Sequence, residues 1–313
     1  MAGAGFAFVG WVPAYVLLMC TVVIIGMASA TYHPQASKTV NFLSSDNNKA
    51  ANMGIFSLGG NAGMAVGSIL MAFLLTLPGG LHNTMYFVLP GLLVFGLMMK
   101  YMPEYKRVNL EHNLKVQAAK KSGAVQKIPY CGLALVLFFI FMRSTIHTGL
   151  STYLPLFFIN FRNAEPAFAS MLVSCFLLGG VAGTYVGAVL SDRLGARRII
   201  LGSVLCSIPA IWLIANVTHP AAVLAAVVLA GFSIIGSFAT TTILAQTMLP
   251  NNVGMAAGLT IGFSVGMGGF GVTILGFLAD NYGLPFVMNL MTVLPVIATL
   301  TAFKIPVPPQ MQK

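Results

Sequence analysis

Long, uninterrupted apolar stretches recur along almost the whole of this 313-residue sequence. A helix needs about 20 residues to cross roughly 30 Å of hydrocarbon, and most of the stretches approach or exceed that length. With 58% hydrophobic and only 7% charged residues, the chain has too little polar surface for a soluble globule. The sequence therefore predicts an all-α integral membrane protein with nine spans, at about residues 14–31, 53–77, 84–101, 129–159, 167–190, 199–216, 221–246, 255–279 and 284–303.

The other membrane architecture, a transmembrane barrel, would show segments of about ten residues in which apolar and polar side chains alternate. A tenth apolar piece, 2–12, is too short to cross alone, and the first basic residue, Lys38, comes too late for a signal peptide. The four cysteines lie singly inside apolar stretches without a C-x-x-C pair. We therefore expect a helical bundle with no metal, disulfide or other cofactor.

The basic residues predict the orientation of the bundle, because cytoplasmic loops carry an excess of Lys and Arg. If the loop at 191–198 is cytoplasmic, only Arg162 falls outside and Arg143 falls within a span. The net charge of +10 is then a topology signal and not a nucleic-acid footprint. We expect a multi-pass protein of the plasma (inner) membrane, with the lipid bilayer as partner and its C-terminus cytoplasmic. The predicted inside residues are Lys38, Lys49, Lys100, Lys106, Arg107, Lys115, Lys120, Lys121, Lys127, Arg193, Arg197, Arg198, Lys304 and Lys313.

One polar stretch is much longer than the others. Residues 103–128, PEYKRVNLEHNLKVQAAKKSGAVQKI, are rich in Lys and Arg and are typical of a cytoplasmic linker whose middle can form a short surface helix. The chain would then divide into a partial N-terminal bundle at 1–102, this linker, and a six-helix C-terminal bundle at 129–313.

An internal repeat supports two related bundles. NNKAANMG at 47–54 aligns without gaps on NNVGMAAG at 251–258, an offset of 204 residues. Applied to the start of the second half, this offset places the start of the first half about 75 to 80 residues before Met1, on the assumption of a parallel repeat. The expected architecture is a two-bundle transporter lacking its first two to three transmembrane helices.

Charged residues gather in the stretch GAVLSDRLGARRII, at 187–200, between two apolar spans. It resembles the cytoplasmic signature G-x-x-x-D-R-x-G-R-R of the major facilitator superfamily, with Ala188 at the usual Gly and one inserted residue before the Arg pair. An Asp there can cap a neighbouring helix, and a Gly allows a tight turn. We predict a cytoplasmic gate, the alternative being a loop that only sets orientation. Its residues are Asp192, Arg193, Gly195, Arg197 and Arg198.

Three further motifs, YHPQA at 32–36, SLGGNAG at 57–63 and GMGGFG at 266–271, are similar to those of the fosmidomycin-resistance branch of that superfamily. Gln35 stands where that branch usually has Glu. The resemblance implies a secondary transporter that exports a small drug-like or anionic solute in exchange for protons.

Ionisable side chains inside a bilayer are costly and usually functional. Arg143, His147 and Ser151 follow one another at intervals of four residues on one predicted helix face. They would present a cation suited to a phosphonate or carboxylate, a titratable imidazole and a hydroxyl to the cavity. The alternative makes Arg143 a structural tie to backbone carbonyls and His147 a packing residue. Asn61 can bind substrate or a neighbouring helix.

Two strips of glycines at intervals of four residues predict close helix packing, on which the two halves can rock. They consist of Gly59, Gly63 and Gly67 in one span, and Gly254, Gly258, Gly262 and Gly266 in another.

The sequence has no paired carboxylates, nucleophile with base or P-loop, so an enzyme or an ATP-driven pump lacks its chemistry. Two alternatives to an exporter stay open. One is a symporter that imports a sugar or an organic acid, since the fold is shared. The other is a non-transporting membrane fragment or subunit.

Overall fold

The computed structural model describes residues 2–45, 47–121 and 129–312, and everything described is helix, turn or short connection. Eight helical segments in this part of the chain are long and apolar enough to cross a bilayer. They coincide with eight of the nine predicted spans. The remaining one, 53–77, is also helical and lies in α3 (Lys49–Thr76), which is not among those eight.

The chain divides into two compact units, each with its own packing. The first comprises residues 1–43 and 59–126, and the second comprises 44–58 and 127–313. The predicted linker is largely helical, because α4 runs without interruption from Val88 to Lys121, through Pro103. Residues 122–128 of that linker, including Lys127, lie outside the described residues, as does Lys313.

The first unit contains the short apolar piece at the start of the chain, which folds as α1 (Ala2–Phe8) and η1 (Val9–Trp11). The other elements are α2 (Tyr15–Leu43), most of α3, η2 (Gly80–Phe87) and α4. Hydrogen bonds join α1 and η1 to η2: the Thr84 hydroxyl donates to the Ala7 carbonyl of α1 at 2.9 Å, and the Trp11 indole of η1 donates to the His82 carbonyl at 3.0 Å.

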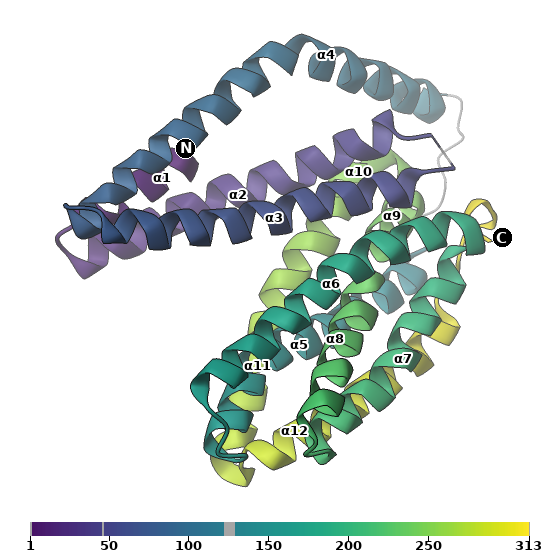
Figure 1. The fold of residues 1–313 in the computed structure, drawn as a ribbon. Coiled ribbons are helices and arrows are strands. Elements are labelled where there is room, and N and C mark those ends of the chain that lie inside the picture. The colour runs from purple at the N-terminus through teal and green to yellow at the C-terminus, as the bar shows by residue number, and fades with distance from the viewer. Residues whose placement is uncertain (1, 46, 122–128, 313) are drawn as a thin grey trace. The chain divides into compact units, whose positions relative to one another are not determined.

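The second unit is a bundle with six candidate spans between Tyr130 and Lys304 (Figure 1). Three of the spans are single helices that follow one another closely: α5 (Tyr130–Asn160), α6 (Pro166–Leu194) and α7 (Ala196–Asn216). The fourth span is broken at Ser237 into α8 (Pro220–Gly236) and α9 (Phe238–Met248). The fifth starts with η3 (Pro250–Asn252), α10 (Val253–Ala257) and a π-helical turn, η4 (Gly258–Gly262), before α11 (Phe263–Tyr282). The sixth is α12 (Leu284–Lys304), and η5 (Pro309–Met311) follows it.

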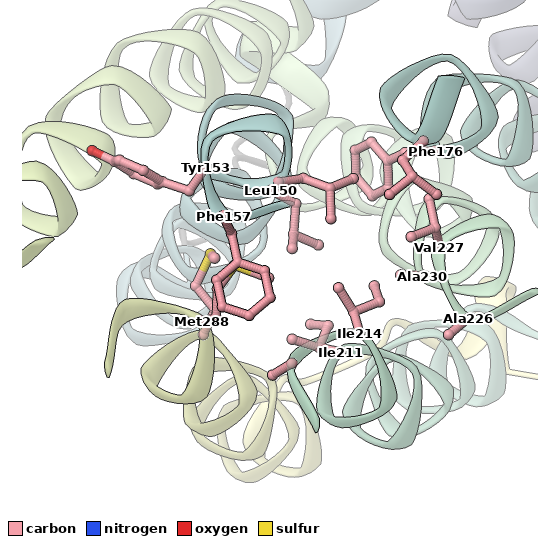
Figure 2. Close-up of a cluster of buried hydrophobic side chains, with 14 of the residues drawn as sticks. Leu150, Tyr153, Phe157, Phe176, Ile211, Ile214, Ala226, Val227, Ala230 and Met288 are labelled. Carbon is pink, nitrogen blue, oxygen red and sulfur yellow. The ribbon is translucent and has the colours of Figure 1, made fainter. Parts of the chain in front are cut away.

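Two clusters of buried apolar side chains form the core of this bundle. The first cluster joins α5, α6, α7, α8, α11 and α12, and Figure 2 shows Leu150, Phe157 and Phe176 among its members. The second cluster joins other parts of α5, α7 and α12 to α9, through residues such as Val136 and Leu244. The two clusters occupy successive lengths of α5: the second ends at Met142 and the first begins at Ile146.

Candidate functional site

Arg143 lies in the interval of α5 between the two apolar clusters, and its side chain is 5% exposed. Its Nε atom is buried and has no hydrogen-bond partner. The guanidinium carbon Cζ lies 5.1 Å from the centre of the Phe238 ring, at the start of α9. Among the described residues, no carboxylate or backbone carbonyl pairs with this cation. The alternative of a structural tie to carbonyls therefore finds no support in these contacts.

His147 follows Arg143 by one helical turn and is half-buried. Its ring lies 5.7 Å from that of Phe176 on α6, with an interplanar angle of 30°. Arg143 and His147 thus each have an aromatic ring beside them, from α9 for Arg143 and from α6 for His147. An apolar wall next to a cation strengthens any interaction with an anion, because it excludes water.

Ser151, the third predicted residue of this face, donates its hydroxyl hydrogen to the His147 carbonyl at 2.9 Å. This bond within α5 uses the only donor of the side chain. Ser151 can still accept a hydrogen bond from a ligand. The groups on this helix face that can donate to a ligand are therefore the Arg143 guanidinium and the His147 imidazole.

Asp192 lies at the end of α6 and caps the N-terminus of α3. Its carboxylate accepts hydrogen bonds from the backbone N–H of Ala50 at 3.2 Å and of Ala51 at 2.8 Å. The first N–H groups of a helix lack intrahelical partners and carry partial positive charge, so a carboxylate there is stabilising. This contact explains why residues 44–58 belong to the second unit, although the sequence predicted them in the N-terminal bundle.

Ala188, which stands where the signature usually has Gly, faces a glycine of α3. A Cβ placed on Gly54 of α3 would lie 2.7 Å from the methyl group of Ala188. The missing side chain of Gly54 therefore makes room for the Ala that replaces the usual Gly.

The basic half of the same loop contacts the ends of other helices. Arg197 donates to the Phe303 carbonyl at 2.6 Å, in the last turn of α12, and Arg198 donates to the Leu194 carbonyl at 3.4 Å. Cations at helix C-termini satisfy carbonyls and oppose the helix dipole. Gly195, between α6 and α7, has φ of 92°, a conformation in which a Cβ is disfavoured. Arg193 is exposed.

Comparison with known proteins places these features in a family. The sequence model of the Major Facilitator Superfamily matches residues 1–165 and 133–313, which together span the chain. The chain belongs to the major facilitator superfamily. The resemblance carried by the D-R-x-G loop is thereby confirmed, and the protein is a membrane transporter and not an enzyme.

Two curated members of the superfamily match over 96% of the chain. One is the uncharacterized MFS-type transporter YfnC of Bacillus subtilis, 29% identical over 306 residues and covered over 74% of its own length. The other is the fosmidomycin resistance protein of Escherichia coli, 26% identical over 301 residues and covered over 73%. The chain thus spans about three quarters of each relative's length.

Solved structures of superfamily members share the fold. The E. coli fucose:proton symporter FucP has a TM-score of 0.74 with 12% identity, and covers 98% of this chain and 81% of its own. The human organic anion transporter MFSD10 has a TM-score of 0.70 with 11% identity, with 96% and 74% covered. At such identities the likeness establishes the fold alone.

At five of the seven glycines in the two predicted strips no described residue packs closely, and the packing role of the strips stays a prediction. A Cβ added at Gly59, Gly63 or Gly67, or at Gly262 or Gly266, meets no atom within 4 Å. The spacing places small residues on one helix face, but it does not show which neighbouring helix approaches that face. Gly258 begins the π-helical turn.

The close approach occurs instead between α6 and α8, along a strip with the same spacing that sequence reasoning missed. A Cβ on Gly179, Gly183 or Gly187 would lie 2.4, 2.0 or 2.1 Å from the carbonyl oxygens of Val228, Phe232 and Gly236, in that order. Only glycine allows two helix backbones to approach this closely.

The GMGGFG motif has a related role at the α5–α11 contact. A Cβ on Gly268 would lie 2.7 Å from the Ser144 hydroxyl, and one on Gly271 would lie 2.2 Å from that of Thr145. The Ser144 hydroxyl also donates to the Ser264 carbonyl. The two glycines therefore accommodate the polar residues next to Arg143.

Asn61 is half-buried on the part of α3 that belongs to the first unit. Its role as a substrate or helix contact stays a prediction.

Proposed function

We propose that this protein is a proton-coupled exporter of a small anionic solute, with Arg143 as the group that binds the anion. The observation that carries the proposal is the buried Arg143, whose Nε atom has no hydrogen-bond partner and beside which no acidic side chain is found among the described residues. Intramembrane Arg side chains normally pair with acids or carbonyls, and an uncompensated buried charge costs several kcal/mol. A carboxylate or phosphonate of the substrate would supply the missing partner.

Two comparisons bear on the class of substrate. The fosmidomycin resistance protein, 26% identical, supports export of a drug-like molecule. The structural neighbours include a fucose:proton symporter and a proton:xylose symporter, but they are only 12% and 13% identical. Import of an uncharged sugar would leave the guanidinium of Arg143 without a chemical role, so the anion is favoured.

The direct test is transport. The gene, expressed from its own locus, and its deletion are compared for sensitivity to fosmidomycin, and inverted vesicles are assayed for drug accumulation with and without a protonophore. Greater resistance with the gene present, and accumulation that collapses with the proton gradient, are expected. Accumulation that survives the protonophore would exclude proton coupling.

His147 is the proposed proton carrier, because an imidazole can gain and lose a proton and no other titratable side chain on α5 lies within one turn of Arg143. His147→Gln keeps a polar group of similar size but cannot change charge. Transport by this variant is expected to vary less than about twofold between pH 5.5 and 8, while the wild type changes severalfold. The measurement is initial transport rate against pH at equal membrane abundance. A pH profile unchanged by His147→Gln would assign proton coupling to another group.

Asp192, Arg193, Gly195, Arg197 and Arg198 are the proposed cytoplasmic gate. In support, Asp192 joins the end of α6 to the start of α3, and Arg197 joins the same loop to the end of α12. Contacts between helix ends that break and re-form can separate two transport states.

Asp192→Asn is expected to slow transport roughly fivefold while insertion is unchanged, because a neutral amide keeps the shape of the cap and loses about 1 kcal/mol of charge-assisted hydrogen bonding. Transport rate and membrane abundance are measured on the same preparation. Rates equal to wild type would reduce this loop to an orientation signal.

We also propose a plasma (inner) membrane location with the C-terminus cytoplasmic. The support is the asymmetry of the basic residues, since fourteen of the sixteen agree on one side.

A further inference from the structure

A layer of polar residues separates the two apolar clusters of the second unit. On α5 the layer is Arg143, Ser144 and Thr145, between Met142 of one cluster and Ile146 of the other. Polar residues also lie between members of the two clusters on α7, on α12 and at the α8–α9 break. We call these residues the middle layer: Arg143, Ser144 and Thr145 on α5, Ser207 on α7, Ser237 and Thr240 at the α8–α9 break, Ser264 on α11 and Thr292 on α12.

The middle layer holds nearly all of the unpartnered buried polar atoms of the described chain. Six buried side-chain nitrogen or oxygen atoms have no hydrogen-bond partner, and only the Nε of Arg162 lies elsewhere. The remaining five are Arg143 Nε and the hydroxyl oxygens of Thr145, Ser237, Thr240 and Thr292. Buried polar groups are almost always paired, so these five atoms lack partners that a bound ligand can supply.

The two threonines that follow Thr240 in the chain do have hydrogen-bond partners. Thr241 donates to the Ser237 carbonyl at 2.9 Å and Thr242 to the Phe238 carbonyl at 3.0 Å, so both are satisfied within their own helix. Thr240 would ordinarily use the Gly236 carbonyl, four residues earlier. That oxygen is directed at Gly187 of α6, where a Cβ would lie only 2.1 Å away.

The break between α8 and α9 adds a second feature that suits an anion. α9 has 11 residues, and its N-cap residue, Ser237, has φ of −89° and ψ of 0° and makes no capping hydrogen bond. Its first residue, Phe238, is the one whose ring covers the Arg143 guanidinium at 5.1 Å. The N-terminus of a helix attracts negative charge, and broken helices inside membranes commonly present such ends to substrates.

We propose that the middle layer is the seat of the substrate's acidic group, a carboxylate or phosphonate. Arg143 neutralises the charge, and the hydroxyls of Ser237 and Thr240 donate hydrogen bonds to the oxygen atoms of the group. This inference rests on the proposed export of an anion and specifies where its charged end binds. Water alone would satisfy the hydroxyls, but it would leave the guanidinium without a counter-charge.

The test uses the full chain in detergent, with phenylphosphonate as anionic probe and its neutral dimethyl ester as control. Dissociation constants come from the concentration dependence of the thermal unfolding midpoint. Ser237→Ala and Thr240→Val are each expected to weaken phenylphosphonate binding about tenfold, the loss of one hydrogen bond to a charged group. Thr240→Ser, which keeps the hydroxyl, is expected to retain the wild-type affinity. The ester should bind weakly and equally to all variants.

Thr241→Val is the matched control, because Thr241 is adjacent and equally buried but already bonded to its own helix. It should change affinity less than twofold. If Thr240→Val and Thr241→Val reduced the affinity for phenylphosphonate equally, the middle layer would not be the binding place. The reduction would then come from altered packing. Arg143→Ala separates the two proposals. If it abolishes binding while Ser237→Ala and Thr240→Val leave binding unchanged, only the middle-layer proposal fails. If millimolar phenylphosphonate stabilises no form of the chain, both fail.

Discussion

Arg143→Ala is expected to abolish transport of anionic substrates, and Arg143→Lys to retain part of it. Alanine removes the only charge available to the anion on this part of α5, while lysine keeps a point charge but loses the two-pronged hydrogen bonding of the guanidinium. Loss of one partner of a desolvated ion pair typically costs 2–5 kcal/mol, so substrate affinity should fall roughly a hundredfold or more. The measurement is transport of a phosphonate or carboxylate drug, together with equilibrium binding.

Stability without ligand separates a binding role from a structural one. Because no described acidic side chain pairs with the guanidinium and only the Phe238 ring partly offsets its charge, Arg143→Ala should raise the unfolding midpoint of the ligand-free protein. If Arg143 were a structural tie, the same variant would lower that midpoint. A variant that is destabilised and still transports anions would contradict the assignment of Arg143 as the anion-binding group.

The sequence was sufficient for the helices because their signal is local. The positions of the spans follow from apolar runs longer than about 17 residues, and helices buried in soluble proteins seldom contain such long runs. Helix ends were harder to predict. The span ending near Lys100 continues in α4 to Lys121, since residues beyond Pro103 are mostly good helix formers although they are polar. Hydropathy detects where a helix leaves the apolar region, not where it ends.

The partners of the site residues could not be predicted, because they lie far away in the chain. The Asp192 side chain was expected to cap a neighbouring helix, but only the fold identifies that helix as α3, more than 140 residues earlier. The middle layer is a still weaker sequence signal. Thr240, Thr241 and Thr242 are the same residue type and adjacent in the sequence. Thr241 and Thr242 bond carbonyls of their own helix, whereas the Gly236 carbonyl, the usual acceptor for Thr240, lies against Gly187.

Gly183→Ala is expected to prevent the second unit from folding stably. A Cβ at this position would lie 2.0 Å from the Phe232 carbonyl oxygen and 2.7 Å from the Phe232 Cα, and neither atom can move without displacing the α8 backbone. Overpacking of a rigid contact costs about 1–3 kcal/mol, and more where backbone must shift. Close contacts at Gly179 and Gly187, one turn away on either side, keep α8 from moving away to make room, because a Cβ there would lie only 2.4 and 2.1 Å from the facing carbonyl oxygens. We expect low membrane yield and a lowered unfolding midpoint in detergent.

Gly202→Ala on α7 and Gly266→Ala on α11 are the matched controls, because a Cβ at either position meets no atom within 4 Å. In a helix without a clash, alanine is favoured over glycine by about 0.5–1 kcal/mol, so both controls should be neutral or slightly more stable. The contrast between Gly183 and Gly266 also decides which glycine strip holds the bundle together. If Gly266→Ala proved as damaging as Gly183→Ala, the second strip would also pack against a helix, and close approach at α6–α8 would not be special to this fold.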